Sequence, residues 1–183
     1  MVAGVFLLGI VANNYAPHLS VLYDACGFDS EEIAALVSIY GLTLAFGKCG
    51  YGFLVDSIGA FRASLILYVF AALGMGLTCM ADSSGLVIAY LAVGASGIGF
   101  AIVTVSISIY SSGMSTEEHY ARTVSRLQLA CNLGSLVFGA VPGIIADRTG
   151  SYLPAFFVMF ILTCIAGLLL SIFYHRIIRR SQR

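Results

Sequence analysis

Charged side chains are scarce in this sequence. Its 183 residues include nine basic and nine acidic side chains, 10% of the chain, whereas a typical soluble domain has about 25%. A soluble domain of this length needs a polar shell, which so few charges cannot provide. A soluble enzyme and a disordered segment are therefore excluded, and the zero net charge indicates no nucleic-acid partner. With 60% hydrophobic residues and a mean hydropathy of +0.98, the chain is predicted to be an integral membrane protein.

Metal and redox motifs are also lacking. Four of the five cysteines lie in apolar segments, where a cysteine acts as a small apolar residue. None of the cysteine spacings is typical of a zinc or redox site. The cysteines are Cys26, Cys49, Cys79, Cys131 and Cys164. We therefore expect no metal site, no cofactor and no catalytic residue.

Six apolar runs account for most of the chain. Each has about 20–27 residues, enough to cross about 30 Å of hydrocarbon as a helix. The period-two polarity of barrel strands is absent. We predict an all-α membrane bundle that forms one domain over residues 1–183, with a tail at 175–183. The predicted spans are 1–23, 33–55, 61–81, 85–111, 127–146 and 153–174.

Basic residues predict the orientation of these spans. An even number of spans places both chain ends on one side of the membrane. On that side would lie Arg62, Arg122, Arg126, Arg176, Arg179, Arg180 and Arg183. The opposite side would hold only Arg148, together with several acidic residues. The positive-inside rule then predicts a cell-membrane protein with both termini cytoplasmic.

An octapeptide of the pattern GxxxDxxG occurs twice, 91 residues apart. The copy at 52–59 ends the second predicted span, and the copy at 143–150 ends the fifth. Its defining residues are Gly52, Asp56, Gly59, Gly143, Asp147 and Gly150. A repeat of three spans is inverted in the membrane, so the two copies would lie at opposite faces. This 3+3 inverted repeat is typical of secondary transporters.

The residue types of the repeat suggest two roles. Gly52 and Gly143 would permit close approach of helices. The two aspartates would lie at water level, where each can pair with Arg62 or Arg148 or cap the next helix. Alternatively, each copy is an ordinary turn after a helix. Its recurrence at corresponding positions favours the transporter interpretation.

The first copy, followed by Arg62, resembles the loop signature of the major facilitator superfamily. The segment 143–157, GIIADRTGSYLPAFF, resembles the connection between the eleventh and twelfth helices in that superfamily, and looks most like its oxalate–formate antiporter and monocarboxylate transporter branch. The resemblance covers the whole chain as the carboxyl-terminal six helices of a twelve-helix protein. It implies a partner, a second six-helix half, which would be either a missing amino-terminal half or a homodimer mate.

One basic residue, Lys48, lies well inside a span. A charge at the bilayer centre costs about 2.5–3.5 kcal/mol, so we interpret it as functional, with snorkelling to water as the alternative. The resemblance implies that a basic residue on this helix binds a substrate carboxylate. Other polar residues within spans are further candidates for substrate binding: Tyr40, Asn14, His18 and Asn132. For each of them, hydrogen bonding between helices is the alternative.

The leading hypothesis is transport of a small organic anion, a mono- or dicarboxylate, coupled to protons or a counter-anion. The second hypothesis is a truncated transporter fragment without activity of its own. A remote third is a rhomboid-like protease with Ser96 as nucleophile. That chemistry needs a histidine within hydrogen-bond reach, and His175 lies beyond the end of its span, so we expect no enzyme.

Overall fold

The fold is entirely helical in the part of the chain that the structure describes. The computed structural model describes residues 1–83 and 85–181. Its elements are α1 (Val2–Ala25), α2 (Ser30–Ile58), α3 (Ala60–Thr78), a short 3-10 turn (Ala81–Ser83), α4 (Leu86–Phe100), α5 (Ile102–Met114), α6 (Glu117–Phe138), α7 (Val141–Thr149) and α8 (Leu153–Ser181).

These helices form six membrane spans, because two spans consist of two helices each. α4 and α5 make up one apolar segment, Leu86–Gly113, and α6 and α7 make up another, Glu117–Thr149. Together with α1, α2, α3 and α8, the described residues contain six segments long and apolar enough to cross a membrane. The prediction of a six-helix membrane bundle is confirmed.

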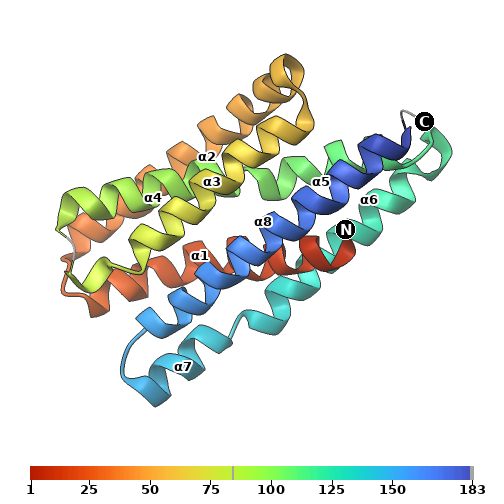
Figure 1. The fold of residues 1–183 in the computed structure, drawn as a ribbon. Helices are drawn as coiled ribbons and strands as arrows, with labels where there is room; N and C mark the ends of the chain where they lie inside the picture. The colour runs from red at the N-terminus through yellow and green to blue at the C-terminus, as the bar shows by residue number, and fades with distance from the viewer. Residues whose placement is uncertain (84, 182–183) are drawn as a thin grey trace.

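The spans run alternately up and down. Figure 1 shows the start of α1 and the end of α8 at the same end of the bundle as the α2–α3 and α5–α6 connections; we call this the terminal end. The other connections lie at the opposite end, called here the far end. The second repeat copy therefore ends at the far end, and the first ends at the terminal end, as an inverted repeat requires.

Two helices continue beyond the apolar runs that predicted them. α6 begins at Glu117, ten residues before the predicted span at 127–146, because a polar sequence can continue a helix outside the hydrocarbon. α8 continues through Ser181, so the predicted tail at 175–183 is helical as far as it is described. Residues 182–183 of that tail lie outside the described residues.

Glycines bring two pairs of helices into backbone contact. A Cβ at Gly9 of α1 would overlap the backbone of Cys131 in α6, and one at Gly134 of α6 would overlap the carbonyl oxygen of Phe6. The same reciprocal arrangement joins α2 and α4 through Gly47 and Gly97. In a 3+3 repeat, span one corresponds to span four, and span two corresponds to span five. The pair formed by spans one and five therefore corresponds to the pair formed by spans four and two. The packing therefore follows the repeat that the sequence indicates.

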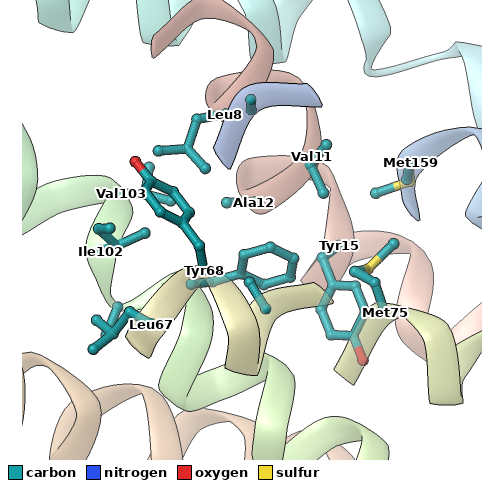
Figure 2. Close-up of a cluster of buried hydrophobic side chains, with 14 of the residues drawn as sticks. Leu8, Val11, Ala12, Tyr15, Leu67, Tyr68, Met75, Ile102, Val103 and Met159 are labelled. Carbon is teal, nitrogen blue, oxygen red and sulfur yellow. The ribbon is translucent and has the colours of Figure 1, made fainter. Parts of the chain in front are cut away.

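Aromatic rings fill the centre of the bundle. Tyr15 of α1 is fully buried, and its ring lies 5.2 Å from that of Tyr40, 5.3 Å from Phe100 and 5.9 Å from Phe156. Figure 2 shows Tyr15 beside Met75, among apolar side chains of α1, α3 and α5. The Tyr15 hydroxyl hydrogen-bonds Thr78 of α3 at 2.9 Å, so the buried phenol is satisfied.

A second polar cluster joins three spans nearer the terminal end. Ser64 of α3 lies 2.8 Å from the hydroxyl of Tyr51 in α2 and accepts a hydrogen bond from Tyr110 of α5 at 3.1 Å. The hydroxyls of Tyr68 and Tyr110 are 3.2 Å apart. Buried hydrogen-bonded groups of this kind fix helices relative to one another where no water competes.

Candidate functional site

A cavity of about 150 Å³ lies among the first, second and fourth spans. α1 contributes Asn13 beside Ala12, and α2 contributes Tyr40, Leu44 and Lys48. The fourth span closes the cavity with Phe100 of α4 and with Val103 and Thr104 of α5. A cationic amine, a phenol, an amide and a hydroxyl group thus converge on one small space with apolar walls.

Lys48 supplies the positive charge of this cavity. Tyr40, Leu44 and Lys48 are spaced four residues apart, so they share one face of α2. The Lys48 side chain is half-buried, and no ion pair to it is found among the described residues. An ammonium group without a protein carboxylate in an apolar bundle is available to an anionic ligand.

Asn14 and His18 do not line this cavity; they join α1 to the fifth span. Asn14 donates from Nδ2 to the carbonyl oxygens of Ile10, at 2.7 Å, and Ser135, at 3.2 Å. His18 donates from Nε2 to the carbonyl oxygen of Gly139 at 3.0 Å. Ser135 lies in the last turn of α6, and Gly139 lies between α6 and α7. Asn14 and His18 therefore satisfy acceptors at and just before the break in the fifth span.

Asn132 also lies away from the cavity. It is exposed on α6, and its Oδ1 accepts a hydrogen bond from Nε2 of Gln128 at 3.2 Å, one turn earlier. Of the five predicted substrate-binding residues, the structure thus brings together Lys48 and Tyr40.

Two cavity residues, Asn13 and Thr104, were not among the predicted binding residues. Asn13 is adjacent to Asn14, and the sequence around them is apolar on every face of α1. The sequence therefore does not show which of the two asparagines lines a cavity. Thr104 is a single hydroxyl in the fourth span. A threonine there is as typical of an ordinary hydrogen bond to its own helix as of a binding site.

The repeated octapeptide ends two helices on a glycine at positive φ, with ψ 153° at the first and ψ 7° at the second. Gly59 follows α2 with φ +83°, and Gly150 follows α7 with φ +75°, a backbone region that favours glycine. Asp56, Asp147, Arg62 and Arg148 are all exposed, and the described residues show no ion pair among them. The second glycine of each copy is thus explained by the turn itself.

Two expectations about the repeat are wrong. The aspartates do not cap the next helix: α3 follows Gly59, which has no side chain to cap it, and the Leu153 amide at the start of α8 donates to Ser151 Oγ at 3.2 Å. Gly52 and Gly143 permit no close approach within this bundle either, because a Cβ at each would meet nothing within 4 Å. Both glycines lie on surfaces that no other helix among the described residues covers.

The protease arrangement is not formed. Ser96 is fully buried on α4, where its backbone faces Gly74 of α3, while the ring of His175 lies 5.4 Å from that of Phe61 at the start of α3. The two α3 positions are 13 residues apart, about 20 Å along the helix. Ser96 and His175 are therefore far outside hydrogen-bond reach.

Comparison with known proteins gives one family. The model of the Major Facilitator Superfamily matches residues 1–183. A search of curated proteins found no match. The match covers every span and every cavity residue described above.

Proposed function

This chain belongs to the Major Facilitator Superfamily of transmembrane transporters, and we propose that it carries a small organic anion, a mono- or dicarboxylate, across the cell membrane. The observation that supports this substrate class is the cavity of Lys48, Tyr40, Asn13 and Thr104. Its one charge is positive and has no acidic partner among the described residues. A carboxylate supplies that partner, and the amide and hydroxyl groups supply its hydrogen bonds.

We further propose that a second six-helix half completes the binding site. In α2 only 17% of the membrane-spanning window is buried within the bundle, against 56% in α1. Three glycines of α2, Gly41, Gly50 and Gly52, face open space. A surface of exposed glycines favours close contact with another helix bundle. The transport step would be a rocking of the two halves around Lys48, with protons or a counter-anion as the coupled species.

The exposed charges at the two ends suit a role outside the cavity. In this proposal Asp56 at the terminal end and Asp147 at the far end contact the second half in alternate states. The excess of arginine at the terminal end supports a cytoplasmic orientation for it under the positive-inside rule.

Lys48 is the only lysine in the sequence, which permits a direct binding test. Reductive methylation with carbon-13 formaldehyde labels Lys48 and the terminal amine, and the methylated lysine keeps its charge. Titration with formate, lactate or oxalate should shift the Lys48 resonance and leave the terminal-amine resonance unchanged. Absence of a shift with all three anions would overturn the carboxylate assignment.

The matching transport test compares two charge deletions in proteoliposomes. Lys48→Ala should abolish uptake of the radiolabelled anion, whereas Arg122→Ala, which removes an exposed arginine of α6, should leave it within about twofold of the native rate. Retained uptake by Lys48→Ala contradicts the proposal. Since Lys48→Arg keeps the charge, it separates a need for charge from a need for lysine geometry.

A further inference from the structure

A groove of about 340 Å³ runs between α3 and α8 on the outside of the bundle. Leu65, Val69 and Ala72 line it from α3, and Cys164, Gly167 and Leu168 line it from α8. A Cβ at Gly167 would lie 3.3 Å from a ring carbon of Tyr68, so the absent side chain is part of what hollows the groove. The lining is almost entirely apolar, and it is separate from the Lys48 cavity.

Basic side chains collect at one end of this groove. The helices are antiparallel, so Leu65 of α3 and Ser171 of α8 mark the same end, the terminal end. One turn beyond Leu65 lies Arg62, and one turn beyond Ser171 lies His175. The ring contact of Phe61 with His175, at 5.4 Å, shows that these two helix ends are adjacent.

Further positive character comes from Arg176 and from the start of α3. Arg176 is exposed beside His175. The residue before α3 is Gly59, so no side chain caps the first amides of the helix, and a helix N-terminus favours an anion. Three acids lie at the terminal end: Asp56 in the last turn of α2, and Glu117 and Glu118 in the first turn of α6. None of them makes an ion pair with Arg62 in the part of the chain described.

We propose that this groove binds an anionic phospholipid. One acyl chain lies along the apolar groove, and the phosphate lies one helical turn beyond its end, against Arg62, His175 and Arg176. Charge complementarity selects the occupant: a zwitterionic headgroup neutralises less of this basic cluster, and a sterol has no phosphate to place there. The site is independent of the transported substrate, so it stands or falls separately from the proposed function.

The sequence contains no tryptophan, so the fluorescence of a single introduced tryptophan reports which lipids contact that one position. Leu168→Trp places the probe on the groove, where Leu168 is 65% exposed. The matched control is Leu133→Trp on α6, 45% exposed and outside the groove. Each variant is reconstituted in phosphatidylcholine vesicles that contain a low mole fraction of either phosphatidylglycerol or phosphatidylcholine with brominated acyl chains, which quench tryptophan fluorescence.

Brominated phosphatidylglycerol should quench the Leu168→Trp probe with an apparent affinity about tenfold above that of brominated phosphatidylcholine. The Leu133→Trp probe should show no preference. Added salt should reduce the preference, because screening weakens headgroup contacts. Equal quenching of the groove probe by both lipids overturns the proposal and indicates an ordinary lipid annulus.

Charge removal tests the proposed headgroup contact. Arg62→Gln with His175→Gln in the Leu168→Trp background should abolish the preference for phosphatidylglycerol; a preference that survives also overturns the proposal. Native mass spectrometry of the unmutated protein gives a readout free of folding effects. After detergent extraction it should retain phosphatidylglycerol in preference to phosphatidylcholine, and equal retention counts against the site.

Discussion

The second and fifth spans carry the same octapeptide but differ in structure. α2 is one continuous helix of 29 residues, from Ser30 to Ile58. The fifth span is interrupted after Phe138 and resumes as α7 at Val141. The motif ends each span on a glycine at positive φ, but ψ is 153° at Gly59 and 7° at Gly150. The repeat therefore supplies a glycine at the end of each span, whereas residues outside the motif determine the geometry of the turn and whether the span is continuous.

Two features account for the break in the fifth span, a proline within the span and a histidine on α1. Pro142 has no amide hydrogen to donate to the carbonyl of Phe138, and it disfavours helical geometry at Val141. The carbonyl of Gly139 accepts instead from His18 of α1. α2 contains no proline. The break is thus stabilised from a neighbouring helix rather than by the span itself.

The largest expected difference between the two spans comes from adding a side chain to each. Gly134→Leu on α6 should strongly lower the midpoint of thermal unfolding, because Gly134 faces the backbone of α1 at Phe6. The free energy of unfolding should fall by about 3 kcal/mol or more. Gly52→Leu on α2 should leave the midpoint unchanged, since nothing lies within 4 Å. Circular dichroism in detergent micelles measures both; equal losses would contradict the packing described here.

The turn glycines should respond differently in the two spans. Gly150→Ala places a Cβ in the left-handed helical region, which should lower the free energy of unfolding by about 1–2 kcal/mol. Gly59→Ala should lower it more, because φ +83° with ψ 153° is a region almost restricted to glycine. The control is Gly41→Ala, at a helical position in open space, and it should be neutral or slightly stabilising. Equal losses in the Gly59 and Gly150 variants would contradict the different geometry of the two turns.

A smaller effect should distinguish the broken span. His18→Leu removes the hydrogen bond to Gly139. The free energy of unfolding should fall by about 0.6 kcal/mol, the average for such bonds in membrane bundles. Amide hydrogen exchange should rise around residues 139–144 and stay unchanged in α2. Unchanged exchange at the break would mean that His18 does not stabilise it.

The smallest change in stability is expected from Pro142→Ala. Alanine restores a donor for the Phe138 carbonyl, so the fifth span should become more continuous and thus more like α2. The new amide at residue 142 should be protected from exchange, and protection of the residues after it should rise, while the melting midpoint changes little. If protection stays low, His18 rather than the proline maintains the break.

The sequence was sufficient to predict the six spans, because twenty or more apolar residues in a chain with so few charges have few other stable arrangements. The sequence also allowed Lys48 and Tyr40 to be placed together, because their spacing puts both on one face of a helix. It could not distinguish Asn13 from Asn14, because that choice depends on how α1 is rotated against α6. Nor could the sequence show that Gly52 faces open space, because nothing in the sequence of a span shows whether another helix covers a given glycine.

The polar side chains of α1 have a consequence for synthesis in the membrane. Asn13, Asn14 and His18 find their partners on α6, or at its end, 118 to 121 residues later in the chain. At about 5–20 residues per second, those partners are made roughly 6–24 s after α1. During that interval α1 holds two amides and an imidazole without their final partners. The final docking of the first span must therefore await the fifth, and until then the insertion machinery has to retain a span with unpaired polar groups.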